Sequence, residues 1–272
     1  MFSPYYARAR RRGDADPENH CALNVALYGR RDKRWALTER PRASLARSAA
    51  TLAIGPSALE WDGDTLAVRI DEVTAPLPAR IRGVVRVHPA ALAGGAYALD
   101  AAGHHRWLPI APCAHVEVAL ERPALRWSGP GYFDANAGDE PLEDSFASWS
   151  WSRAATRAGT AVLYDVLRRD GGRHSLALGF DAGGETRAID SPPVAALPAT
   201  GWRVARATRT DPGSRATVVR TLEDTPFYAR SLVAAQLAGE PVTAVHESLS
   251  LDRFRSRWVQ ALLPFRTPRA RR

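Results

Sequence analysis

Cysteine is scarce in this chain of 272 residues, and long apolar runs are missing. The two cysteines, Cys21 and Cys113, provide neither a disulfide framework nor the clustered thiols of a structural metal site. No apolar run reaches the roughly 18–20 residues that a membrane-spanning helix needs. The N-terminal segment has no apolar core beside its arginines, so it does not resemble a signal peptide. These absences predict a cytoplasmic protein.

Short catalytic motifs are missing as well. The sequence has no Gly-x-Ser-x-Gly nucleophile motif, no phosphate-binding or dinucleotide-binding glycine pattern, and no His-Glu-x-x-His. The pair His104-His105 could suggest a metal, but adjacent residues of a strand point to opposite faces and cannot easily share an ion. The sequence therefore predicts no metal site and gives no support to nucleophilic hydrolysis.

Positive charge is carried almost wholly by arginine, since Lys33 is the only lysine. The formal net charge is +8, from 37 basic and 29 acidic residues, and arginines cluster near both ends of the chain. Solvated basic tails are one interpretation, and attraction to an anionic surface is the other. Because no nucleic-acid-binding module is recognisable, a membrane surface is favoured over nucleic acid as the partner.

Alternation of apolar and polar residues recurs in short segments that end at turn residues, which predicts an antiparallel all-β architecture. The expected strands are residues 22–29, 34–39, 66–73, 80–88, 115–121, 160–168, 174–180, 202–208, 215–222 and 242–251. Hairpin turns are expected at residues 30–33, 170–172 and 211–213, and short helices at 228–237 and 255–263. Sequential hairpins of this kind favour one or two up-and-down barrels.

The segment Trp127–Arg153 is unusually rich in aromatic and acidic residues. Tyr132 and Asp134 are two positions apart, so they share one face if this segment is a strand, and His105 and Trp107 do the same elsewhere. A carboxyl group among aromatic rings could donate a proton in an apolar pocket. From spacing alone, a buried polar pair in a packed core explains the same pattern, and so do tryptophans that simply fill the core.

Eight segments carry a resemblance to a known family. They are residues 13–29, 34–40, 55–73, 105–112, 121–153, 160–171, 220–232 and 239–254. In these segments, which extend over nearly the whole chain, the sequence resembles carotenoid 1,2-hydratase, also called hydroxyneurosporene synthase, of photosynthetic purple bacteria. Members of that family usually carry a further section before the sequence FSPYYARARRR, which here follows Met1 directly. The resemblance therefore predicts a shortened N-terminus.

The resemblance implies a lyase that needs no cofactor and adds water to the terminal C1=C2 bond of an acyclic carotenoid such as neurosporene or lycopene. It also implies two lipocalin-like antiparallel β-barrel domains, residues 1–126 and 127–272, of which the first could lack strands. A water-insoluble polyene substrate implies peripheral contact with the inner membrane. The oligomeric state is not specified. A carotenoid or lipid carrier, or another isoprenoid-transforming enzyme, would fit the same scaffold.

Three residues, His105, Trp107 and Tyr132, match positions that the family associates with its active site, and Asp134 lies beside Tyr132 in the densest segment of the resemblance. We expect Asp134 to be the proton donor, Trp107 and Tyr132 to stabilise a carbocation, and His105 to orient the water or the acid. Further candidates for lining the substrate site are Trp127, Trp149, Trp151, Glu143 and His246.

Overall fold

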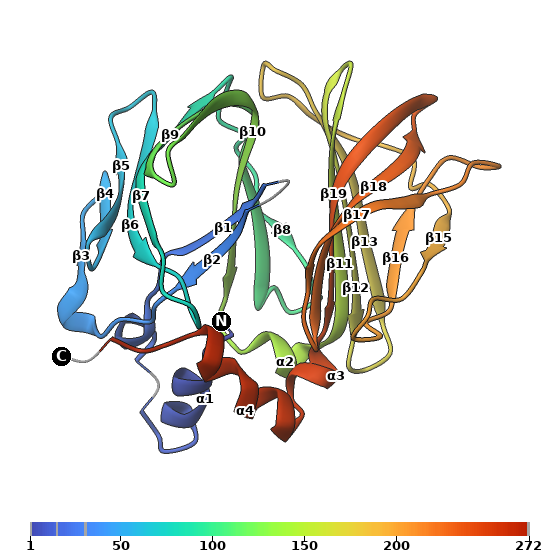
Figure 1. Cartoon of the computed structure of the whole chain (residues 1–272). Coiled ribbons are helices and arrows are strands. Elements are labelled where there is room, and N and C mark those ends of the chain that lie inside the picture. The colour runs from blue at the N-terminus through green and yellow to red at the C-terminus, as the bar shows by residue number, and fades with distance from the viewer. Residues whose placement is uncertain (1, 15, 30–31, 271–272) are drawn as a thin grey trace. The chain divides into compact units, whose positions relative to one another are not determined.

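The computed structural model describes residues 2–14, 16–29 and 32–270. Antiparallel strands dominate these residues and the helices are short (Figure 1), so the all-β prediction is confirmed. Contacts divide the chain into two compact units, each of which gathers segments that are distant in sequence. The first unit contains residues 1–89, 114–131 and 260–272, and the second contains residues 90–113 and 132–259.

Two long strands, β9 (His105–Arg122) and β10 (Leu125–Gly138), each contribute to both units. The first part of β9 and the last part of β10 belong to the second unit. Compactness does not fix where a closed barrel begins or ends, so the expected division between residues 126 and 127 stays a prediction.

The first unit is built on short antiparallel strands that pair mostly in sequence order. Its elements are α1 Pro4–Arg10, η1 Pro17–His20, β1 Asn24–Tyr28, β2 Lys33–Leu37, η2 Arg42–Ser44, β3 Leu45–Arg47, β4 Thr51–Ile54, β5 Ser57–Trp61, β6 Leu66–Val73 and β7 Arg80–Pro89. The strands β1 and β2 form one ribbon, while β3 to β7 pair consecutively and β7 pairs with the second part of β9. The five strands expected in this half are confirmed, although the turn at 30–33 lies partly outside the described residues.

The core of the first unit is formed by inward-pointing residues of its alternating strands. Along much of these strands alternate residues point inward, and most of the buried ones are aliphatic, although Ser57 and Glu72 are buried as well. The buried cluster consists of Val25, Ala36, Ile70, Ile81, Val118 and Leu120.

The second unit is organised around a sheet whose strand order is β14-β13-β12-β11-β19-β18-β17 within the described chain. Its elements are β8 Tyr97–Ala98, α2 Leu142–Ser145, β11 Phe146–Thr156, β12 Gly159–Arg168, β13 Arg173–Phe180, β14 Thr186–Ala188, β15 Val194–Leu197, β16 Arg206–Arg209, β17 Thr217–Asp224, β18 Tyr228–Leu237, β19 Glu240–Ser250 and α3 Leu251–Phe254. The hairpin β12–β13 and the strands β17 and β19 confirm the predictions for those segments.

The final helix, α4 (Arg257–Arg266), confirms the helix expected at residues 255–263. Among the helices that the structure describes, none is long and apolar enough to span a membrane.

The helix expected at residues 228–237 is wrong, because this segment is strand β18. Alanine and leucine give the segment a helical appearance, but its buried positions alternate strictly with partly exposed ones. Pairing with β17 on one side and β19 on the other satisfies its backbone, so tertiary context overrides local propensity.

The hairpin expected from residues 202–208 and 215–222 is also wrong. Strand β16 pairs with β15, and β17 pairs with β18. The Asp211-Pro212-Gly213 turn does form, but Asp211 accepts hydrogen bonds from the backbone amides of Ala238 and Gly239, at 3.0 and 2.7 Å. The turn residues therefore bind the loop between β18 and β19 instead of closing a hairpin of their own.

The two faces of the second unit's sheet differ in chemistry. On one face, the ribbon of β15 and β16 lies against β11 and β19 (Figure 1), where a cluster of small aliphatic side chains is buried. The register places Trp151 opposite both Tyr164 of β12 and Glu247 of β19, so these three side chains emerge on the other face. That aromatic and acidic face carries the candidate site.

Candidate active site

The centre of the candidate site is the carboxyl group of Asp134 in β10. Its Oδ2 atom accepts a hydrogen bond from Trp107 Nε1 at 2.7 Å and another from the Tyr132 hydroxyl at 2.9 Å. The expectation that Tyr132 and Asp134 share a strand face is therefore confirmed. Because both donors end on Oδ2, neither of them engages Oδ1, which is the oxygen that can carry a proton when the group is neutral.

Trp107 comes from β9 and is completely buried. Its ring centroid lies 5.5 Å from that of Tyr97, 5.9 Å from Tyr164 and 6.2 Å from Phe180. The neighbouring Arg106 is exposed, as the alternation of a strand requires. The packing of three rings around the indole fixes the direction of its N–H toward Asp134.

Trp149 and Trp151 extend the aromatic wall along β11. The ring of Trp151 lies 5.4 Å from that of Tyr132, and the ring of Trp149 lies 6.1 Å from that of Tyr164. Among the described residues, the buried Nε1 atoms of both tryptophans have no hydrogen-bond partner. A buried donor without a partner costs about 1–3 kcal/mol. Two such donors on one strand face could bind a water molecule or a polar group of a ligand.

Burial raises the pKa of Asp134, and the nearby carboxylate of Glu247 raises it further. The hydrogen bonds from Trp107 and Tyr132 act in the opposite direction because they stabilise the ionised form, but the net shift is upward. This environment favours a carboxylic acid that keeps its proton closer to neutral pH than an ordinary aspartate does.

The tyrosines around Asp134 stay neutral. Burial, followed by the negative charge of Asp134, raises the pKa of Tyr132 well above its ordinary value, and the same causes raise that of Tyr164. The guanidinium of Arg153 lies 5.5 Å from the centre of the Tyr132 ring, and burial lowers the pKa of Arg153. Tyr132 can therefore donate a hydrogen bond to Asp134 without becoming a phenolate.

His105 is buried, but its ring nitrogens contact other groups than Asp134. Nδ1 lies 3.1 Å from Asp100 Oδ2, and Nε2 lies 3.2 Å from the backbone oxygen of Glu140. The ring also packs edge-on against Phe146 with centroids 4.8 Å apart. These contacts join the start of β9 to the segment after β10. His105 consequently supports the strands that hold Trp107 and Asp134.

Three sequence candidates are not part of the Asp134 cluster. His246 is fully buried on the opposite sheet face, with Nδ1 2.7 Å from Ser152 Oγ and Nε2 3.0 Å from Ser248 Oγ. Burial lowers the pKa of His246 to about 4. Glu143 lies in α2, where its backbone oxygen accepts hydrogen bonds from arginine side chains. Trp127 belongs to the first unit and is half exposed.

The sequence analysis missed two residues of this face, Tyr164 and Glu247. Tyr164 lies between Leu163 and Asp165 in β12 and carries no motif of its own. Of the neighbours His246 and Glu247, the sequence analysis named only His246 as a lining candidate. Only the pairing of β19 with β11 shows that Glu247 shares a face with Trp151.

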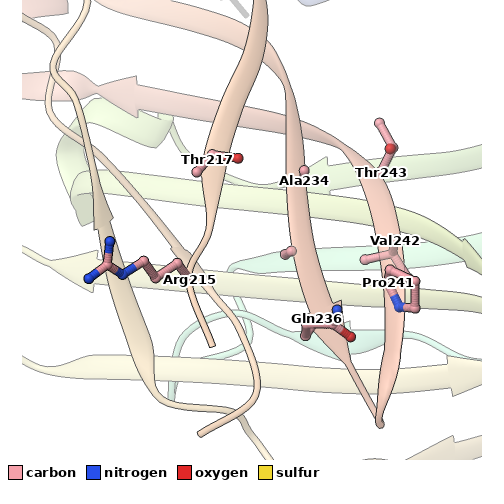
Figure 2. Close-up of a pocket in the computed structure, with 8 residues that line it drawn as sticks. Arg215, Thr217, Ala234, Gln236, Pro241, Val242 and Thr243 are labelled. Atoms are coloured by element: carbon pink, nitrogen blue, oxygen red, sulfur yellow. The ribbon is translucent and has the colours of Figure 1, made fainter. Parts of the chain in front are cut away.

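A pocket of about 300 Å³ lies elsewhere in the second unit, between β17, β18 and β19 (Figure 2). It is lined by Arg215, Thr217, Ala234, Ala235, Gln236, Pro241, Val242 and Thr243. None of these eight residues belongs to the Asp134 cluster, and none of them is a carboxylic acid. Among the residues that the structure describes, no group of three or more histidine, cysteine, aspartate or glutamate side chains could hold a metal ion.

Comparison with known proteins relates the whole chain to one family. The family model described as Carotenoid hydratase CrtC matches residues 1–272. The chain is 59% identical over 270 residues to an acyclic carotenoid 1,2-hydratase of Thiocapsa roseopersicina, covering 99% of this chain and 67% of that protein. It is 51% identical over 272 residues to the enzyme of that name from Rubrivivax gelatinosus, again covering 99% and 67%.

A solved structure supports the fold. The crystal structure of a protein described as AttH from Nitrosomonas europaea matches with a TM-score of 0.55, covering 80% of this chain and 75% of that one. At 15% sequence identity the likeness concerns the fold alone. It agrees with the lipocalin-like antiparallel architecture that was expected.

Proposed function

Since this chain belongs to the Carotenoid hydratase CrtC family, we propose that it adds water to the terminal C1=C2 double bond of an acyclic carotenoid. The observation that carries the chemistry is the Asp134 carboxyl group, which is held by Trp107 and Tyr132 inside an aromatic cluster. This reaction needs a strong proton donor directed at carbon, and then a site that admits one water molecule.

The first step is proton transfer from Asp134 to C2 of the substrate. The π electrons of the alkene form the new C2–H bond, and C1 becomes a tertiary carbocation. An isolated trisubstituted alkene is a weak base, so the acid must be neutral before the reaction and desolvated during it. The raised pKa of Asp134 favours the neutral acid, and Oδ1 is the oxygen from which the proton leaves.

The second requirement is stabilisation of the cation. Tyr132 and Trp151 lie with ring centres 5.4 Å apart beside the acid, and Trp107 and Tyr164 continue the aromatic surface. The face of an aromatic ring attracts a cation by about 0.5–2 kcal/mol, with the larger values for desolvated pairs. Several rings together therefore lower the barrier to protonation while excluding bulk water.

In this proposal Asp134 is the catalytic acid, while Tyr132, Trp107 and Trp151 contact the cation. Trp149 lines the same wall, and His105 keeps β9 and β10 in position. The proposal assigns no role to Trp127, Glu143 or His246.

Product analysis tests the function directly. The chain is produced in bacteria that accumulate lycopene. The extracted pigments are separated by chromatography, and their masses are measured by mass spectrometry. We expect products that are heavier than lycopene by one water molecule for each hydrated end. Lycopene that is retained by the protein without modification would instead identify a carrier, and a rearranged skeleton would identify another isoprenoid-transforming enzyme.

Peripheral attachment to an anionic membrane is part of the proposal, because a rigid polyene does not dissolve in water. The net charge of +8 and the arginines near both ends favour anionic lipid, to which each basic residue near the surface adds about 1 kcal/mol. We expect the protein to float with liposomes that contain anionic lipid and to be released as salt is raised. Equal flotation with neutral liposomes, or none with either kind, would contradict this electrostatic attachment.

A further inference from the structure

Glu247 is a second carboxylate on the same sheet face as the aromatic wall. The register of β19 places it opposite Trp151 on one side and opposite Arg230 of β18 on the other. Its Oε1 atom accepts a hydrogen bond from Arg230 Nε at 2.9 Å and lies 2.6 Å from Arg230 Nη2 in an ion pair. Both contacts from Arg230 are made to Oε1, so they leave Oε2 for another partner. The ion pair also fixes the plane of the Glu247 carboxylate.

Three further observations relate Glu247 to the reaction centre. Its negative charge is a cause of the raised pKa of both Asp134 and Tyr164, so it acts across the space that these groups share. The side chain of Glu247 is about four-fifths buried, with 20% of its surface exposed. In addition, Trp149 and Trp151 present buried N–H groups, without partners among the described residues, from the adjacent strand β11.

A water molecule that attacks a carbocation needs both hydrogen-bond donors and a proton acceptor beside it. It needs hydrogen-bond donors that hold its oxygen, and an acceptor that takes its proton as the C–O bond forms. Indole N–H groups can only donate, and an ionised carboxylate can only accept. Asp134 is less suited to receive that proton directly, because its Oδ2 already accepts two hydrogen bonds and its Oδ1 faces the carbon that it has just protonated.

We propose that Glu247 is the general base of the hydration, accepting a proton from the attacking water through Oε2. This inference rests on the proposed function and adds a second catalytic residue to it. Asp134 gives its proton to C2, a lone pair of the water oxygen forms the bond to C1, and one proton of that water passes to Glu247. Transfer of this proton from Glu247 back to the Asp134 carboxylate, through a water molecule, restores the enzyme. One water molecule is consumed in each cycle, and no other reactant is needed.

The variant Glu247→Gln separates protonation of C2 from the capture of water at C1. Glutamine keeps the size of the side chain but cannot accept the proton, so water capture should slow while protonation by Asp134 continues. The cation then returns its proton to Asp134 and reforms the alkene. In deuterium oxide, the recovered lycopene should therefore carry deuterium at C2, whereas hydrated product should fall at least about tenfold.

Several outcomes would overturn the proposal. Hydration by Glu247→Gln at the parental rate would show that this carboxylate is dispensable. A parallel loss of hydration and of deuterium exchange would show that Glu247 serves protonation or folding instead. Glu247→Asp, which retains a carboxylate, covers the case in which the glutamine variant does not fold, and it should keep more hydration activity than any neutral replacement that folds.

A matched control lies on the same strand. Glu240 begins β19 and forms an ion pair with the exposed Arg157 through its Oε2 atom at 3.7 Å. Glu240→Gln removes one carboxylate from β19 without touching the aromatic face, and its hydration and exchange should equal those of the parent. If the parent protein itself forms no hydrated product, the proposed function fails, whereas an active parent with an equally active Glu247→Gln variant refutes only the role of Glu247.

Discussion

Replacing Asp134 with asparagine is expected to reduce carotenoid hydration by about 10²–10⁴-fold, the range that removal of a general acid usually produces. Asparagine has nearly the same shape and can still accept hydrogen bonds from Trp107 and Tyr132, but it has no acidic proton to transfer to carbon. The measurement is the initial rate of hydrated product formed by purified protein from lycopene in detergent or liposomes.

Deuterium exchange makes this test more specific. Because Asp134 performs the first step, its asparagine variant should lose exchange at C2 together with hydration, unlike the variant Glu247→Gln. Asp165→Asn is a suitable control, since Asp165 forms an ion pair with Arg209 at 2.7 Å on the face opposite Tyr164. Removal of the Asp165 carboxylate should leave the rate of hydration unchanged in the folded protein. Hydration by Asp134→Asn within a few-fold of the parent would assign the acid to another residue.

The pH dependence has a definite sign. Asp134 donates only while it is protonated, and burial holds its pKa above the ordinary value of an aspartate. The rate should therefore decline as pH rises through this raised pKa, and the decline should begin at a higher pH than an exposed aspartate would give.

Replacing Trp107 with alanine is expected to cost about 3–5 kcal/mol of stability, the usual effect of truncating a buried tryptophan. Its side chain is completely buried among the rings of Tyr97, Tyr164 and Phe180, so truncation leaves a cavity and loosens the wall of the candidate site. Unfolding in urea, followed by circular dichroism, measures the loss. A variant as stable as the parent would show that the indole is not a central part of this packing.

Trp107→Phe is the matched variant, because it keeps an aromatic ring and removes the N–H donor. Loss of this donor to the Asp134 carboxylate destabilises the ionised form, so the pKa of Asp134 should rise further and the decline of the rate should move to higher pH. This shift distinguishes an electrostatic role of the indole N–H from simple packing, which would leave the position of the decline unchanged.

Part of the site could be predicted from local sequence. Two-residue spacing correctly placed Tyr132 beside Asp134, because alternate residues of any strand share a face. The meeting of Trp107 with Asp134 is different, since the two residues are 27 positions apart and lie on separate strands. Spacing indicated which residues of β9 face inward, whereas the group that they meet depends on how distant strands are arranged.

The same limit explains the wrong helix and the omission of Glu247. At residues 228–237, composition suggested a helix, but two neighbouring strands supply the hydrogen-bond partners that make this segment β18. At residues 246 and 247, alternation required that the two side chains point to opposite faces, but it gave no information on which face carries the aromatic wall. The register with β11 puts Glu247 there and buries His246 against Ser152.

By itself, the amino-acid sequence determined the all-β class, about half of the described strands and the family, because alternation and dense local similarity are properties of consecutive residues. Tertiary structure alone decided the contact between Trp107 and Asp134, the face that Glu247 occupies and the pairing of β16 and β17. Each of these depends on contacts between residues that are far apart in the chain, and a pattern that repeats every two residues fixes the face of a strand but not the strand that lies beside it.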